Sequence, residues 1–164
     1  MKRLKLKFVW IVCGVYFSSF IVGIFVSNLH DNNFEYTPNP LKDTFVSIDT
    51  LKYIFTNNIK VFLILLTGFF LLKIPTIISL TSNGLMLGYF LGGLSLNNIQ
   101  HVLLSLSIHG VPEILSFFIA AYIAFLGRDE FLEYKKFNIK LLVIGVLMVG
   151  VAAILETYVS PYFI

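Results

Sequence analysis

The sequence predicts an all-α protein, a polytopic helical bundle that lies in a membrane. Of the 164 residues, 57% are hydrophobic and 16% are aromatic, whereas only 13% are charged. A soluble domain of this size has no core large enough to bury so much apolar surface. The apolar residues also gather into stretches near the length of about 20 residues that a helix needs to cross a bilayer. Residues 1–164 are therefore expected to form a single integral membrane domain.

About five stretches fit transmembrane helices. The first lies within residues 1–29 and begins with basic residues, as a signal peptide does. Its apolar segment is too long for a signal peptide and no small-x-small cleavage site follows, so it is expected to stay attached. The predicted spans cover residues 8–28, 59–72, 75–94, 101–126 and 139–159.

Between the first two spans, two further elements are predicted. Residues 30–43 are rich in Asn, Asp and Pro, which predicts an external loop. From Asp43 or Thr44 onward, apolar and polar positions fall on opposite faces of a helix, so an amphipathic helix is expected along the outer membrane surface. The second span is short, and either it thins the bilayer locally or the end of the surface helix completes it.

Small residues predict close packing between helices. In the third span they recur every four residues, and in the first span at four-to-five-residue intervals, so that another backbone can approach each helix. Pro75 suits the first turn of the third span, which predicts a tight hairpin with the second span. The small residues are Gly14, Ser18, Ser19, Gly23 and Ser27 in the first span and Gly84, Gly88 and Gly92 in the third.

The basic residues predict the orientation. Inner segments carry an excess of Lys and Arg in membrane proteins. With the N-terminus in the cytoplasm, nine of these residues lie inside and only Lys42, Lys52 and Lys60 lie outside. The C-terminus is then external, and residues 127–136 form a cytoplasmic connection with a helical turn.

One ionisable pair lies in the middle of the fourth span. His109 and Glu113 are four residues apart and so share a helix face. A carboxylate at the centre of a bilayer costs at least about 2.5 kcal/mol, so it normally faces a partner, a cavity or a ligand. Gly110 and Pro112 predict a kink at the same place, because Pro112 removes a backbone hydrogen bond.

The predicted topology brings other polar groups to a similar depth. Asn83 lies near the middle of the third span and Glu156 in the outer half of the fifth, so both can converge with His109 and Glu113. Three chemistries remain open: a structural hydrogen-bonded cluster, a pathway for protons, ions or a polar substrate group, and a zinc site with His109, Glu113 and Glu156 as ligands.

Several other functions find no support in the sequence. The basic residues form no concentrated patch, so no nucleic-acid partner is expected. Cys13 lies in an apolar run and is most simply a small buried hydrophobe. No Walker or Gly-x-Ser-x-Gly motif occurs, so an enzyme is not the favoured interpretation. Apart from the zinc hypothesis, no cofactor is expected.

Four separated blocks of the sequence stand out in order. They are Phe55-Thr56-Asn57-Asn58-Ile59, Asn83-Gly84 with Gly88, Ile108-His109-Gly110-Val111-Pro112-Glu113, and residues 152–161 from Ala152 to Pro161. Together they resemble the signature of the stage II sporulation protein M family. The resemblance covers the chain from the surface helix to the end, residues 44–164. By motif position it implies that Asn58, Asn83, His109, Glu113 and Glu156 are the important polar residues.

The resemblance implies a multi-pass protein of the bacterial cell membrane. Sporulation members act with peptidoglycan-degrading partners, and compact relatives are associated with circular bacteriocins. We therefore expect a subunit of a complex for bacteriocin export, maturation or immunity, or for envelope remodelling. Expected partners are the lipid bilayer, further copies of the chain or other membrane proteins, a separate ATPase or peptidoglycan hydrolase, and a peptide substrate. The alternatives are a proton- or ion-coupled transporter or channel and, third, an intramembrane metal-dependent hydrolase.

Overall fold

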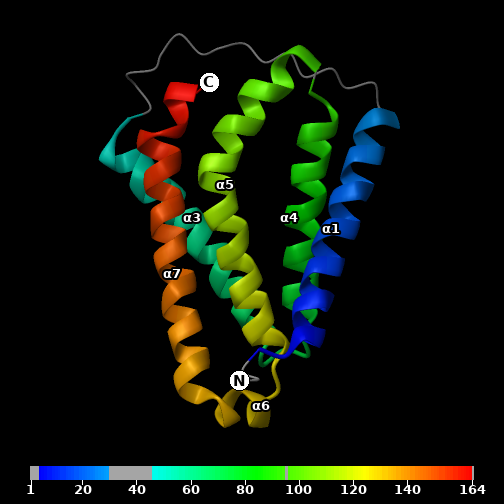
Figure 1. Ribbon diagram of the computed structural model, residues 1–164, viewed down its shortest axis with the longest axis vertical. Helices are drawn as coiled ribbons and strands as arrows, with labels where there is room; N and C mark the ends of the chain where they lie inside the picture. Colours follow the sequence, from blue (N-terminus) through cyan, green and yellow to red (C-terminus); the bar gives the residue numbers. More distant parts are fainter. Residues whose placement is uncertain (1–3, 30–45, 95, 164) are drawn as a thin grey trace.

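All regular structure in the described residues is helical, which confirms the predicted all-α class. The computed structural model describes residues 4–29, 46–94 and 96–163, with the backbone alone for 96–101 and 163. The predicted loop over residues 30–43 lies outside these ranges. The elements are α1 Leu6–Leu29, α3 Ile48–Thr67, α4 Ile74–Gly92, α5 Leu96–Phe125, α6 Arg128–Glu133, α7 Lys135–Tyr158 and the 3₁₀ helix η1 Ser160–Phe163 (Figure 1).

Four of the described helical segments are long and apolar enough to cross a membrane. They are α1, α4, the part of α5 from residue 102 to 125, and α7 together with η1 as far as residue 162. This finding agrees with the predicted membrane protein. The long helices run side by side, and the described N- and C-terminal residues lie at opposite ends of the bundle (Figure 1).

Helix α3 corrects two predicted elements. The surface helix and the second span are one continuous helix, without a break at Thr56-Asn57-Asn58, and it ends at Thr67 rather than at residue 72. Its N-cap is Ser47, whose Oγ accepts a hydrogen bond from the Thr50 N–H at 3.1 Å. The continuous helix matches the predicted alternative in which the end of the surface helix completes the short second span, because no Gly or Pro interrupts the helix at the polar residues.

A compact turn joins α3 to α4. Leu72 and Lys73 adopt positive φ angles of 51° and 66°, and the Thr76 hydroxyl donates to the Leu65 carbonyl at 2.7 Å. Pro75 occupies the first turn of α4 as predicted. The predicted hairpin between these helices is therefore confirmed, and residues 68–73 form its turn.

Helices α1 and α4 form a close parallel pair. Going along the two helices, Gly84 faces Tyr16, Gly88 faces Phe20 and Gly92 faces Ile24. The backbones are so near that a Cβ on Gly84 would lie 2.5 Å from the Tyr16 carbonyl oxygen. The predicted packing role of the α4 glycines is confirmed. In the stripe of α1, Ser19, Gly23 and Ser27 are buried, whereas Gly14 and Ser18 are exposed.

On the other side of the bundle, α3 packs against α5 and α7. Phe62 of α3 is 1% exposed. Its ring lies so close to Gly145 that a Cβ there would approach ring carbons at 2.7 and 2.9 Å and the Ile119 methyl at 3.3 Å. Val149, Ala152 and Ala153 of α7 are fully buried. Small residues on α7 thus allow a large aromatic ring to enter the core.

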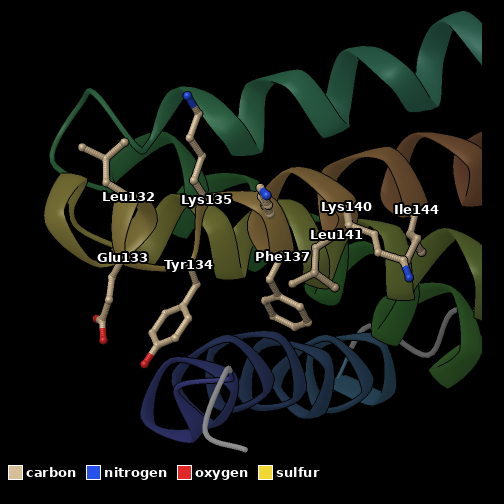
Figure 2. A pocket seen from close by; sticks show the side chains of 9 residues that line it. Leu132, Glu133, Tyr134, Lys135, Phe137, Lys140, Leu141 and Ile144 are labelled. Atoms are coloured by element: carbon tan, nitrogen blue, oxygen red, sulfur yellow. The ribbon is translucent and has the colours of Figure 1, made fainter.

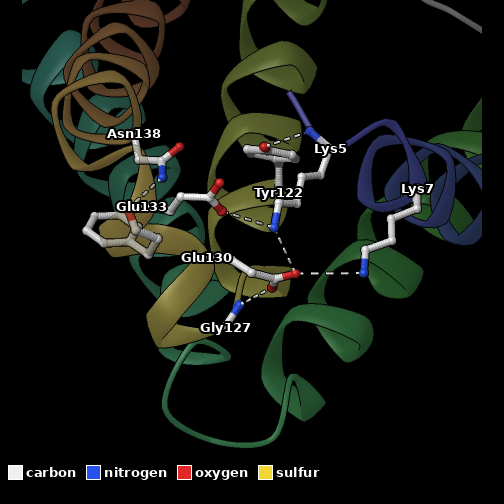
Figure 3. Close-up of polar contacts among 8 residues, drawn as sticks. Lys5, Lys7, Tyr122, Gly127, Glu130, Glu133 and Asn138 are labelled. Carbon is white, nitrogen blue, oxygen red and sulfur yellow. Dashed lines mark hydrogen bonds and ion pairs between the residues drawn. The ribbon is translucent and has the colours of Figure 1, made fainter. Parts of the chain in front are cut away.

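An ionic network closes the end of the bundle that carries α6. Lys5 lies 3.3 Å from a Glu130 carboxylate oxygen and 3.5 Å from Glu133, and Lys7 lies 3.7 Å from Glu130 (Figure 3). The Gly127 N–H donates to Glu130 at 2.8 Å. This bond, followed by the charges of the two lysines, holds the pKa of Glu130 below its ordinary value. Desolvation opposes the charge of Lys5, but the two carboxylates outweigh it and raise the pKa of Lys5.

Candidate functional site

His109 connects the middle of α5 to the end of the chain. Its Nδ1 lies 2.7 Å from the Ser160 Oγ, and the tautomer of the ring decides which atom donates. Ser160 is 2% exposed. A second hydrogen bond joins the same two segments: the Ser105 Oγ donates to the Ser160 carbonyl oxygen at 3.3 Å. The start of η1 is thus attached to α5 at two positions one helical turn apart.

Glu113 lies on α5 and Glu156 on α7, two helices that pack against each other. Their carboxyl groups lie within electrostatic range of each other, and Glu156 lies within that of His109. Both side chains are half-buried. The phenol of Tyr16, which is 3% exposed, lies within range of Glu113 from α1. In the described part of the chain, neither carboxyl accepts a hydrogen bond or forms an ion pair.

These residues form a row of polar groups, which we call the α5–α7 polar row: Ser160, His109, Glu156 and Glu113. It starts at η1 and extends toward the middle of the bundle. Half-buried carboxyls without partners inside an apolar helix pair can take up a proton, bind a cation, or accept a hydrogen bond from a polar group. The structure brings together three of the residues predicted from the sequence.

Asn58 lies in α3, and no hydrogen bond joins it to the polar row in the described structure. It is 5% exposed, and its Oδ1 is 3.5 Å from the Asn57 Nδ2. Its own Nδ2 has no partner among the described residues. A buried amide left unpaired costs about 1–3 kcal/mol, so it calls for an explanation. Asn58 is one turn before Phe62, which places it on the face of α3 that packs against α5 and α7.

Asn83 has a different environment. Its Nδ2 donates to the Ser79 carbonyl of its own helix at 2.8 Å. With Ile64 of α3 and Pro75 it lines a pocket of about 420 Å³ near the start of α4. No hydrogen bond joins Asn83 to His109, Glu113 or Glu156 in the described structure. No contact among the described residues therefore supports the predicted convergence of Asn83 with the polar row.

The predicted zinc ligands can be tested on geometry. In the ranges that the structure describes, no three side chains of His, Cys, Asp or Glu come together as ligands for a metal ion. The predicted kink at Gly110 and Pro112 stays a prediction, and α5 is helical throughout this region. His30 and the side chain of His101 lie outside the described residues.

Two residues of the site were missed from the sequence. Ser160 follows the last helix, and serine before proline at a helix end usually indicates a turn. Its position at the end of the fourth block, Ser160-Pro161, was the available signal. Tyr16 carried no signal, because only the packing of α1 across the bundle brings its phenol toward Glu113.

The helices and their half-buried acidic pair define a helical-bundle membrane protein with a polar row inside it. The family model described as Stage II sporulation protein M matches residues 8–161. The chain therefore belongs to this family. The match includes α1, beyond the range of the resemblance seen in the sequence. An uncharacterized protein of Methanocaldococcus jannaschii is similar, with 32% identity over 123 residues, which are 66% of this chain and 69% of that protein. No solved structure matches the chain.

The four family-like blocks lie in two different parts of the structure. Three of them lie where α3, α5 and α7 pack: Phe55 is in van der Waals range of Gly150, and His109 contacts Ser160. The block with Gly84 and Gly88 instead packs against α1. The block in α5 and the block at the end of α7 contain the polar row, whereas the block with Gly84 and Gly88 joins α4 to α1.

Proposed function

We propose that the protein is a multi-pass subunit of a membrane complex in the bacterial cell membrane. The complex exports, matures or gives immunity to a peptide such as a circular bacteriocin, or it remodels the cell envelope. Membership of the family supports this assignment. The observation that carries it is the packing of three family-like blocks where α3, α5 and α7 meet, two of which contain the α5–α7 polar row. This row is the proposed working site of the subunit.

The proposed orientation has the N-terminus in the cytoplasm and the C-terminus outside. Lys5 and Lys7 lie with α6 at one end of the bundle, and the ring contact between Phe69 and Phe131 at 5.7 Å brings the α3–α4 turn to the same end. Most of the described Lys and Arg residues are therefore at this end, as the positive-inside rule requires. In this orientation the polar row begins at the external side.

The proposed partners follow from the same assignment. A chain without a nucleotide-binding motif needs a separate ATPase if the process uses ATP, and a separate hydrolase if it cuts peptidoglycan. Large apolar side chains of α1, among them Trp10 and Phe25, are 74% and 64% exposed. Lipid, a second copy of the chain or another membrane subunit would cover them.

A genetic experiment tests this function in the native host. The gene is deleted and then restored as wild type, as Glu113→Gln or as Asp129→Asn. Asp129 is an exposed matched control in α6. Secreted peptides are measured by mass spectrometry, self-sensitivity by growth in spent medium, and envelope shape by microscopy. We expect a loss in one of these readouts that wild type and Asp129→Asn restore and Glu113→Gln does not. A deletion strain unchanged in all three would overturn the proposal.

A second candidate, a proton- or ion-coupled transporter, is favoured by one observation. Glu113 and Glu156 carry two half-buried carboxyls on helices that pack together, and His109 lies within electrostatic range of Glu156. Groups of this kind act in intramembrane proton relays. Purified protein in liposomes with an internal pH dye should then show proton flux that Glu113→Gln abolishes and Asp129→Asn preserves. No flux under any imposed pH or ion gradient rules this candidate out.

A further inference from the structure

A basic cavity at the α6 end of the bundle adjoins an apolar groove. The cavity has a volume of about 790 Å³ and is lined by residues at the start of α7 and the end of α6 (Figure 2). The groove has a volume of about 380 Å³ and is lined by hydrophobic and aromatic side chains of α1, α5 and α7. Leu141 and Ile144 line both spaces. Each volume falls within the range of about 300–1,000 Å³ that is typical of ligand sites.

The cavity carries unbalanced positive charge. Lys136 and Lys140 both line it, and they are four residues apart on one face of α7. Neither forms an ion pair with any described residue. Glu133 also lines the cavity, but its carboxylate lies 3.5 Å from Lys5. Like charges on neighbouring positions of a helix repel each other, so an anion between them is favourable.

The apolar groove extends along the bundle from the cavity that Lys136 and Lys140 line. Phe137 and Leu141 point from α7 toward α1 (Figure 2), and Val12 and Phe118 line the groove from α1 and α5. From Lys140 to Met148 the helix rises about 12 Å. This is close to half of the roughly 30 Å hydrocarbon core of a bilayer. The space thus has a cationic end at the membrane surface and an apolar part as deep as one leaflet.

We propose that this combined space binds an anionic phospholipid of the cytoplasmic leaflet. The phosphate group lies at Lys136 and Lys140, and one acyl chain lies in the groove between α1, α5 and α7. The charge of the cavity selects an anionic head group, as basic pockets between transmembrane helices do. The apolar groove distinguishes a lipid from a free phosphate, because phosphate alone leaves the groove empty.

The test uses the full chain purified in detergent and native mass spectrometry. It is titrated with dioleoylphosphatidylglycerol or with dioleoylphosphatidylcholine. We expect the anionic lipid to bind at least about tenfold more tightly. The double variant Lys136→Gln with Lys140→Gln should weaken its binding by about thirtyfold, since each lysine near a lipid head group contributes about 1 kcal/mol and 1.4 kcal/mol is tenfold.

Matched controls separate charge from shape. Lys52→Gln with Lys60→Gln removes the same charge from α3 and should leave binding unchanged. Cys13→Phe fills the groove and should weaken binding of the anionic lipid at least about tenfold, whereas Ile21→Phe, on an exposed part of α1, should not. Circular dichroism checks that each variant is folded.

Three outcomes would overturn the proposal. The first is equal affinity for the two lipids, and the second is unchanged affinity in the Lys136 and Lys140 double variant. In the third, inorganic phosphate displaces the lipid completely while Cys13→Phe binds normally, which identifies an anion site without an acyl chain.

Discussion

Replacing Gly88 by Ala should force α1 and α4 apart. A Cβ at this position would overlap the Phe20 carbonyl oxygen and lie 2.8 Å from the Phe20 carbonyl carbon and 3.1 Å from the Ile24 nitrogen. All three are backbone atoms, so no side chain can turn away to make room. Ordinary contacts between carbon atoms begin near 3.5 Å, so the helices must separate by about 1 Å.

The size of the effect follows from this overlap. Inserting a methyl group into a well-packed contact costs about 1–3 kcal/mol. Each kcal/mol shifts the melting temperature by about 2–4 °C for a chain of 150–250 residues. Alanine also has a higher helix propensity than glycine by about 1 kcal/mol, but this gain is the same in a Gly14→Ala control. We therefore expect Gly88→Ala to melt about 2–12 °C below Gly14→Ala.

The matched control is Gly14→Ala in α1. A Cβ at Gly14 meets nothing within 4 Å, so the same change there should be neutral or should stabilise the helix by up to about 1 kcal/mol. Thermal unfolding in detergent can be followed with a thiol-reactive dye on Cys13, the single cysteine. Equal melting temperatures for the two variants, within about 1 °C, would refute the close pairing of α1 with α4.

Three further predictions concern single side chains. Glu130→Ala should lower the melting temperature at pH 7 by about 2–4 °C through loss of the bond from Gly127. Because the folded-state pKa of Glu130 is lowered, its charge stabilises the fold at pH values above the ordinary pKa of 4.5. The difference in melting temperature between wild type and Glu130→Ala should therefore disappear as the pH falls through the lowered pKa. Ser160→Ala should cost about 1–3 kcal/mol and speed hydrogen exchange in η1, since the His109 ring loses its buried partner. Asn58→Leu should raise the melting temperature, because it removes an unpaired amide from the core.

Each of these predictions has a contrary outcome. Asp129→Asn is the control for Glu130→Ala, and a similar loss in both would show that the ionic network contributes nothing specific. For Ser160→Ala, the control is Ser18→Ala, an exposed serine that bonds within its own helix; unchanged exchange in η1 contradicts the His109 contact. If Asn58→Leu destabilises the protein, the Asn58 amide has a partner, such as a bound water or ligand.

The helix class and the packing stripes could be predicted because they depend on local composition. Gly84, Gly88 and Gly92 recur every four residues, and this spacing alone places them on one face. The partner helix could not be predicted, since α1 and α4 are distant in sequence. Gly14 looked equivalent to Gly23, but it is two residues from Tyr16 and so lies on a different face of α1, where a Cβ would meet nothing within 4 Å.

The polar row was predicted in part. His109 and Glu113 were found because ionisable groups are rare in apolar stretches, and Glu156 because the topology placed it at a similar depth. The individual contacts depend on the rotation of each helix about its axis, which composition does not determine. Asn83 illustrates this: its depth was right for the row, yet its side chain bonds to Ser79 within α4.

The pairing of α1 with α4 also sets an order for assembly in the membrane. Roughly 60 residues separate the end of α1 from the end of α4, and a ribosome adds about 5–20 residues per second. The small-residue face of α1 therefore waits about 3–12 s after its own synthesis before its partner is complete. During this interval α3 is made first but offers no glycine stripe. Lipid or the insertion machinery must shield α1 until α4 arrives, so a mutation that slows α4 would expose the nascent chain to mispairing.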